Sequence, residues 1–145
     1  MDKADLPWQA MAEMPDDPRF LPNLPRVVEI LAYPAVQLLD VAGPLQVFAS
    51  ANELTARNGD APLYAPRVVS TGAPVVTASA GLGLVAAPLP RPRAALDTLL
   101  VAGGPGVHAA AADAVVLHWV RARAKGARRI ASVCTGALCL QQQVC

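Results

Sequence analysis

Apolar residues gather into short, nearly unbroken runs along the chain, and segments with a helical spacing of apolar residues separate some of these runs. Runs of this length, rich in Val, Ile and Leu, are typical of strands buried in a parallel sheet. We predict strands in the segments RVVEILAY (26–33), YAPRVVSTG (64–72), DTLLVAGGPG (97–106, entering a glycine-rich loop) and RRIASV (128–133). The segment PVVTASAGLGLVAAP predicts a short extended pair that turns near Gly81.

Two segments predict helices. PLQVFASANELTAR places Pro44 at the first helical position, and Asn58-Gly59 follows as a stop signal. Its apolar stripe consists of Leu45, Val47, Phe48, Ala51 and Leu54. DAVVLHWVRARAKG (113–126) offers Asp113 as the N-cap residue, a cationic last turn and a terminal glycine. The alternation of strands and helices predicts an α/β domain with a mostly parallel sheet.

Composition and charge narrow the class of protein. The chain has 145 residues, 54% hydrophobic and 16% charged, which is enough for one domain with a substantial core. Its net charge of +1 gives no electrostatic footprint for nucleic acid or an anionic membrane. The longest uncharged stretch, residues 68–90, is broken by prolines and polar residues, and the N-terminus lacks the apolar core of a secretory signal. We therefore expect no membrane association and a cytoplasmic location.

The two ends of the chain differ from its middle. Residues 1–25 are rich in proline and show no sustained periodicity, which predicts a poorly ordered extension before a domain at 26–145. Three cysteines lie within the last dozen residues: Cys134, Cys139 and Cys145. An odd number of cysteines without ligand spacing predicts neither a disulfide framework nor a metal site, and no cofactor is indicated.

Unusual chemistry falls at the ends of three predicted strands. Asp40 follows the first strand, the loop Gly103–Gly106 follows the strand at 97, and Cys134 follows the last one. Ligands of open α/β sheets bind beyond the carboxyl ends of the strands. We therefore expect these three features to lie at one edge of the sheet.

The segment IASVCTGALCL gives Cys134 the setting of a nucleophile elbow. Ser132 and Gly136 are the small residues that such a sharp strand-to-helix turn requires two positions before and after the nucleophile. Unpaired N–H groups at the start of the following helix would favour the thiolate. The alternative is that the thiol is a small buried hydrophobe, which we keep as the interpretation of Cys139 and Cys145.

Asp40 is the only charged residue between Glu29 and Glu53. A carboxylate in so apolar a segment is expected to be partly buried and to need a hydrogen-bond donor. It could hold a proton and bond the Cys134 thiol, or it could bond nearby N–H groups at the start of a helix. The sequence leaves the two roles equal.

The loop AGGPGVHA has the spacing of a dinucleotide fingerprint, from Gly104 through Gly106 to Ala109. It does not follow the first strand, and no acidic residue ends the next strand, so we reject that interpretation. We expect instead that Gly103, Gly104 and Gly106 expose backbone N–H groups beside Cys134 as an anion or oxyanion site. His108 could reach the same edge, although a solvated position is the simpler expectation, and His118 is expected to be structural.

RARAKGARR puts five cationic residues into positions 121–129. A phosphate-binding patch is one interpretation, but a solvated helix C-terminus that neutralises its own dipole is the stronger one. We therefore expect this segment to be surface.

Three motifs together carry a family resemblance: ILAYPAVQLLDVAGPLQVFASAN, LDTLLVAGGPGV and IASVCTGA. In this order, from about Arg26 to Leu138, they resemble the ThiJ/PfpI group of the class I glutamine amidotransferase-like superfamily. More narrowly, they resemble the sensor half of AraC-type (GlxA-like) transcriptional regulators. The resemblance implies a flavodoxin-like three-layer sandwich with a mostly parallel sheet and with Cys134 at the elbow.

The resemblance also implies roles for residues. Isonitrile hydratases share these signatures, and by motif position Cys134 would be the nucleophile, supported by Asp40 and Thr135. In AraC-type members the same pocket, here Gly103, Gly104, Gly106 and Cys134, is taken to sense a small molecule, while a C-terminal helix-turn-helix pair binds DNA. After SVCTGAL the family continues with further strands, whereas this chain reads CLQQQVC. We therefore expect a domain incomplete at its C-terminus, without a DNA-binding half.

The first functional prediction is thus a truncated ligand-sensing domain of an AraC-type regulator. It would bind a small molecule, contact DNA only through a missing domain and form a homodimer. One alternative is an isonitrile-hydratase-like cysteine enzyme, and another is a non-functional fragment.

Overall fold

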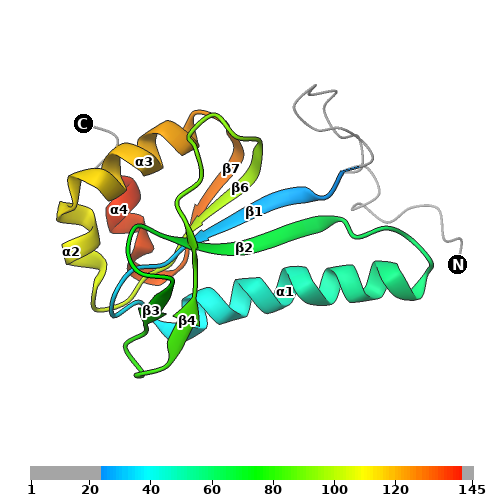
Figure 1. Cartoon of the computed structure of the whole chain (residues 1–145), viewed down its shortest axis with the longest axis horizontal. Coiled ribbons are helices and arrows are strands. Elements are labelled where there is room, and N and C mark those ends of the chain that lie inside the picture. The colour runs from blue at the N-terminus through cyan, green and yellow to red at the C-terminus, as the bar shows by residue number, and fades with distance from the viewer. Residues whose placement is uncertain (1–23, 142–145) are drawn as a thin grey trace, which may run out of the picture.

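The computed structural model describes residues 24–141, so most of the predicted extension at 1–25, and Cys145, lie outside the described residues. Strands and helices alternate along the chain as predicted, except that β2 to β6 follow one another without a helix between them (Figure 1). The strands are β1 (Arg26–Leu31), β2 (Tyr64–Ser70), β3 (Val75–Thr77), β4 (Gly83–Val85), β5 (Ala87–Pro88), β6 (Leu96–Val101) and β7 (Ala127–Ser132). The helices are α1 (Leu38–Arg57), α2 (Val107–Ala112), α3 (Ala114–Ala124), the 3₁₀ turn η2 (Cys134–Gly136) and α4 (Ala137–Gln141).

The main sheet has five strands in the order β5-β2-β1-β6-β7, and every pairing in it is parallel. The chain winds outward from β1 to β2 and β5, and then returns to the other side of β1 to form β6 and β7. The right-handed crossover rule therefore puts α1 and α3 on opposite faces. This is the flavodoxin-like α/β arrangement, and its topological switch point lies between β1 and β6.

The predicted extended pair is confirmed as the antiparallel hairpin β3–β4. Its turn passes through Gly81, whose φ of +83° is a conformation that glycine adopts without penalty. The carbonyl of Thr77 accepts a hydrogen bond from the N–H of Ala35, which ties the hairpin to the loop after β1. In Figure 1 the hairpin lies beside the start of α1, at the end of the molecule where the strands of the main sheet finish.

The prediction that Pro44 opens the first helix is wrong. Helix α1 begins six residues earlier at Leu38 and contains Pro44 in its interior, although it ends at Arg57 as predicted. Leu38, Val41, Leu45 and Phe48 are spaced to place apolar side chains on one helical face, and packing of that face outweighs the hydrogen bond that proline cannot donate. The predicted apolar stripe is wrong at Val47 and Leu54, whose side chains are exposed, because α1 packs mainly on β2 and β1 along its opposite face.

The core fills the space between the central strands and the helices. Val28, Ile30 and Leu31 of β1 and Leu99 and Val101 of β6 are fully or almost fully buried. β1 and β6 are inner strands of the sheet, so their continuous apolar runs follow from burial on both faces. Among the described helices, none combines the length and the apolar character that a bilayer crossing needs.

The prediction that the cationic run at 121–129 is solvated surface is wrong for Arg123. Arg123 is completely buried, and its Nε and Nη2 donate to the carboxylate of Glu29 at 2.9 and 2.7 Å. Arg128 and Arg129 pair with the buried Asp97 at 2.7 and 3.2 Å. Buried carboxylates need such partners, so three of the five cationic residues of this run neutralise buried carboxylates of the sheet.

Arg123 also fixes the loop before β6. Its Nη1 donates to the carbonyls of Arg91, Pro92 and Ala94.

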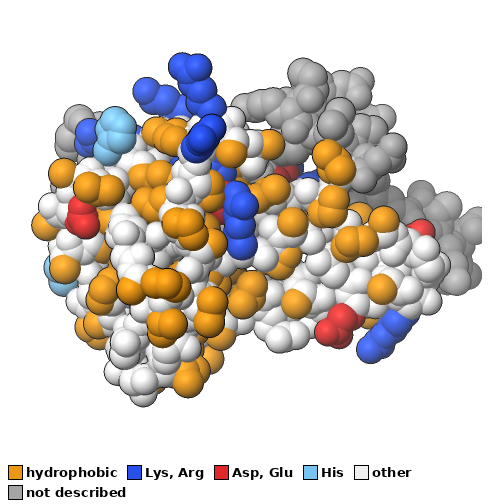
Figure 2. All heavy atoms as spheres, in the orientation of Figure 1, with side chains coloured by type: hydrophobic (Ala, Val, Ile, Leu, Met, Phe, Trp, Pro, Cys, Tyr) orange, Lys and Arg blue, Asp and Glu red, His pale blue; other side chains and the backbone are white. Residues whose placement is uncertain are grey.

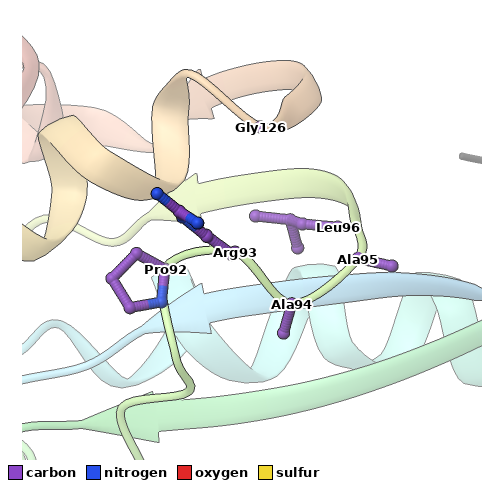
Figure 3. Close-up of a pocket in the computed structure, with 6 residues that line it drawn as sticks. All are labelled: Pro92, Arg93, Ala94, Ala95, Leu96 and Gly126. Atoms are coloured by element: carbon purple, nitrogen blue, oxygen red, sulfur yellow. The ribbon is translucent and has the colours of Figure 1, made fainter.

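A cavity of about 200 Å³ lies next to this loop, and Figure 3 shows its lining of residues 92–96 and Gly126. The cavity lies where β6 begins, at the opposite end of the strand from the glycine-rich loop. In Figure 2 the Lys and Arg side chains gather at the top of the view, where α3 ends in Figure 1, and orange apolar side chains are prominent over the hairpin.

Candidate functional site

The three features predicted to share one edge of the sheet do so. β1, β6 and β7 are parallel neighbours, so their carboxyl ends meet at the same edge. Asp40 lies in the first turn of α1, the loop Gly103–Gly106 links β6 to α2, and Cys134 is the second residue after β7. The site is therefore assembled by topology, from residues that are far apart in the sequence.

Cys134 has the backbone of a nucleophile elbow. Its φ is +52°, a left-handed conformation that costs a non-glycine residue about 1–3 kcal/mol and persists only where the surroundings enforce it. Val133 before it is extended, and the η2 turn begins at Cys134 itself. The side chain is exposed, so the alternative of a buried small hydrophobe does not apply to Cys134, whereas it describes the fully buried Cys139.

Gly136 allows the elbow to approach β6. A Cβ at this position would lie 2.1 Å from the carbonyl oxygen of Val101 and 2.8 Å from that of Ala102. Backbone atoms cannot move aside as a flexible side chain can, so any larger residue would push the elbow away from the strand. The small residue two positions after the cysteine thus has the role that the sequence motif predicts.

The loop Gly103–Gly106 is wedged between the elbow and the segment after β1. A Cβ at Gly103 would lie 2.7 Å from the backbone nitrogen of Thr135 and 2.9 Å from Oδ2 of Asp40. Gly104 has a φ of +127°, and a Cβ there would lie 2.2 Å from the nitrogen of Gln37. These contacts leave no space for side chains at the centre of the site.

The N–H groups of this loop are already engaged, which corrects the prediction that they form a free oxyanion site. Gly103 N–H donates to Asp40 Oδ2 at 3.1 Å, and Gly104 N–H donates to Thr135 Oγ1 at 3.0 Å. Gly106 N–H donates to the carbonyl of Ala35 at 3.1 Å. The loop positions the two polar side chains instead of presenting its own donors to a ligand.

Asp40 takes neither of the two predicted partners. Its carboxylate is buried, with 9% of the residue exposed, and it accepts a hydrogen bond from an N–H 63 positions away instead of from its own helix. No hydrogen bond joins Asp40 to the Cys134 thiol among the described residues. Asp40 and Thr135 flank the same glycine, so both are held next to the elbow.

The sequence reasoning missed Tyr33. This tyrosine follows β1, is 3% exposed, and its hydroxyl donates to the carbonyl of Ala102 at 2.5 Å. Burial raises its pKa, and negative charge on Cys139, Asp40 and Cys134 raises it further. The sequence did contain a signal for Tyr33: it is a polar aromatic residue between the first strand and the segment that contains Asp40. The buried thiol of Cys139 also has a raised pKa, because burial disfavours the thiolate.

The two histidines lie outside this arrangement. His108 is exposed on α2, and His118 is exposed on α3, so the expectation of a structural role for His118 is not supported by burial. Within residues 24–141 no group of three or more His, Cys, Asp or Glu side chains is arranged to hold a metal ion.

Comparisons with known proteins agree with this geometry. No family model matches the chain. A solved ThiJ/PfpI family protein from Pseudomonas syringae superposes with a TM-score of 0.68 at 30% identity, covering 83% of this chain and 46% of that one. An uncharacterised protein encoded in the cpoL 5′ region of Streptomyces lividans is 35% identical over 116 residues, which is 80% of this chain and 78% of that protein.

Two further relatives have named functions. Isonitrile hydratase of Pseudomonas putida is 34% identical over 113 residues, 78% of this chain and 45% of the hydratase. A helix-turn-helix transcriptional regulator of Mycobacterium tuberculosis is 45% identical over 42 residues, 29% of this chain and 16% of the regulator. The chain thus spans about half the length of the hydratase and of the solved Pseudomonas syringae protein.

The fold and the site define a doubly wound α/β protein with a cysteine elbow at its switch-point edge. The chain belongs to the ThiJ/PfpI family, which confirms the predicted resemblance.

Proposed function

We propose that this chain is a ligand-sensing ThiJ/PfpI domain of an AraC-type transcriptional regulator. Its pocket would consist of Cys134, Asp40, Thr135 and the loop Gly103–Gly106. The observation that carries the proposal is the exposed, left-handed Cys134 beside the Asp40–Gly103 hydrogen bond. Strained backbone is retained where it serves function, and the similarity to a helix-turn-helix regulator supplies the regulatory context.

In this role the site would bind a small molecule at the thiol. Asp40 and Thr135 would supply polar contacts on the two sides of Gly103, and the exposed thiol would contact the ligand directly. DNA would be reached through a further domain, and a homodimer would bring two such domains together as regulators commonly require.

The regulator assignment can be tested on the genomic DNA beyond codon 145, read in all three frames. We expect a continuation that encodes two helices with helix-turn-helix spacing. A stop in every frame directly after this codon contradicts the assignment. A continuation that ends roughly 80–100 residues later without such a segment favours the enzyme described next.

A second candidate function is hydration of an isonitrile, and the 34% identity to isonitrile hydratase over 113 residues favours it. The Cys134 thiolate would attack the terminal carbon of the isonitrile, forming an S–C bond, while the same carbon takes a proton through Asp40 to give a thioimidate. Water would then add to that carbon and the C–S bond would break, which returns the thiol and releases a formamide. Thr135, adjacent to the thiol, would orient the substrate.

Incubation with cyclohexyl isonitrile separates the candidates. Formamide that accumulates beyond one equivalent per chain, and that disappears in Cys134→Ser, supports the enzyme. Protection of Cys134 from iodoacetamide without formamide supports a binding pocket. If neither occurs, the isonitrile interpretation is wrong for this chain.

A further inference from the structure

Tyr33 links two of the three segments that form the site. It follows β1 and is buried, and its hydroxyl reaches across to the carbonyl of Ala102, which directly follows β6. The switch point of the sheet lies between these two strands. The bond therefore fixes the separation of the strand ends at the position where ligands of such folds bind.

The carbonyl that Tyr33 bonds is also a carbonyl on which the elbow rests. The Cα of Gly136 approaches Val101 and Ala102 so closely that a Cβ would lie 2.8 Å from the oxygen of Ala102. A rotation of this peptide would therefore be transmitted to the η2 turn that begins with Cys134. The phenol hydroxyl holds the peptide in one orientation.

The ring of Tyr33 lies against the other end of the same loop. A Cβ at Gly106 would be 3.3 Å from Cδ2 of Tyr33, while the hydroxyl bonds Ala102 immediately before Gly103. One side chain thus contacts both ends of the loop whose N–H groups hold Asp40 and Thr135.

The hydroxyl can perform this task only while it carries its proton, because a carbonyl oxygen accepts and does not donate. The raised pKa of Tyr33, caused by burial and by nearby Cys139, Asp40 and Cys134, keeps the hydroxyl protonated. Its position among these groups places it inside the polar cluster of the site.

We propose that Tyr33 is a positioning residue for Cys134: its hydrogen bond to Ala102 holds the glycine loop and the elbow in register, and so maintains the strained backbone that presents the thiol. The proposal rests on the proposed function only in treating Cys134 as the reactive group of the pocket. The proposal concerns the position of the Cys134 thiol, so it can be tested without knowing the ligand.

The experiment compares Tyr33→Phe with Tyr64→Phe, which removes the hydroxyl of the only other tyrosine in the chain. Tyr64 begins β2 and packs its ring edge-on against Phe48 at 4.8 Å, away from the elbow. The rate of iodoacetamide alkylation at Cys134 is measured by peptide mass spectrometry across pH 6–9 in the folded full chain, with unfolding curves to verify the fold.

We expect Tyr33→Phe to lower the rate of Cys134 alkylation by about fivefold or more at pH 7 and at pH 8, since small displacements at reacting groups have large effects. Tyr64→Phe should leave both unchanged. A folded Tyr33→Phe variant whose curve superimposes on that of the original chain overturns the positioning role. If the original chain itself reacts like an unstructured peptide thiol, the proposed function of Cys134 fails instead.

A second measurement does not depend on the stability of Tyr33→Phe. In a Tyr64→Phe, Cys145→Ser chain, biosynthetic 3-fluorotyrosine leaves Tyr33 as the only fluorinated residue. Alkylation of Cys134 should shift its ¹⁹F resonance, because the elbow and the phenol share the Ala102 carbonyl. An unchanged resonance after complete alkylation contradicts the coupling.

Discussion

The backbone N–H of Gly103 donates a 3.1 Å hydrogen bond to Oδ2 of Asp40, joining the loop after β6 to the first turn of α1. The bond crosses the switch point of the sheet and is buried. It makes Asp40 part of the scaffold of the site, whatever chemistry the carboxylate performs, so its contribution to stability and its contribution to reactivity must be measured separately.

Asp40→Ala should lower the free energy of unfolding by about 1–3 kcal/mol, because the Gly103 N–H is left buried without an acceptor. Asp40→Asn keeps an oxygen in nearly the same place, so its loss should be smaller. Urea unfolding followed by circular dichroism measures both. Equal losses for the two variants would show that the charge, and not the hydrogen bond, stabilises this contact.

The close approach of the elbow to β6 leaves no space for a side chain at Gly136. Gly136→Ala should cost about 3 kcal/mol or more, since the new methyl group meets two fixed carbonyl oxygens. Gly43→Ala is the matched control: nothing lies within 4 Å of the added carbon in α1, and the helix should gain about 0.5–1 kcal/mol. Thermal unfolding of both variants checks this, and a tolerated Gly136→Ala would refute the tight elbow.

Arg123 is expected to be essential for folding despite its distance from the site. Arg123→Met removes a buried partner of Glu29 and the donor to the loop carbonyls, which should cost about 3–5 kcal/mol. Arg93→Ala, an exposed arginine in the same loop, should change stability by no more than about 0.5 kcal/mol. Similar unfolding midpoints for the two variants would mean that the buried pair contributes nothing.

Low pH should reduce the free energy of unfolding, because the Asp97 carboxylate becomes protonated. Burial alone would raise the pKa of this carboxyl, but hydrogen bonds from Arg128, Thr98 and Arg129 bring it below its usual range. The unfolded chain therefore takes up the proton first, so the stabilisation is complete above about pH 5 and is lost as the pH falls through the folded pKa. The difference in stability between the original chain and Asp97→Asn should shrink from pH 7 to pH 3, and a constant difference would exclude Asp97 from the acid response.

Much of the fold was predictable because its signals are local. Apolar runs identified β1, β6 and β7, of which β1 and β6 are inner strands of the sheet. Asp113 was recognised as an N-cap that accepts from the N–H groups of Val115 and Val116. The start of α1 was not predictable in this way, because it depends on packing that outweighs a proline inside the helix.

The sequence predicted which segments meet at the site, because strand order alone brings them together. It did not predict the hydrogen bonds between them. Strand order brought Asp40, Cys134 and the glycine loop to one edge. The partner of Asp40 is 63 residues away, and the burial of Arg123 depends on Glu29, 94 residues away, so neither leaves a mark in the local pattern. Tyr33 was missed for the same reason, since its partner lies 69 residues further along the chain.

The two described cysteines should differ sharply in their chemistry. Cys134 is exposed at the elbow, whereas Cys139 is fully buried and its pKa is raised by burial. In a Cys145→Ser chain, iodoacetamide at pH 8 should therefore modify Cys134 in the folded protein and both cysteines in urea. Because the folded pKa of Cys139 lies above the unfolded one, its contribution to stability is complete below about pH 8.5 and is lost as the pH rises further. Peptide mass spectrometry after timed labelling gives the two rates, with Cys134→Ser as the control for peptide assignment. Labelling of Cys139 at the rate of Cys134 in the folded chain would show that α4 does not stay packed on the sheet.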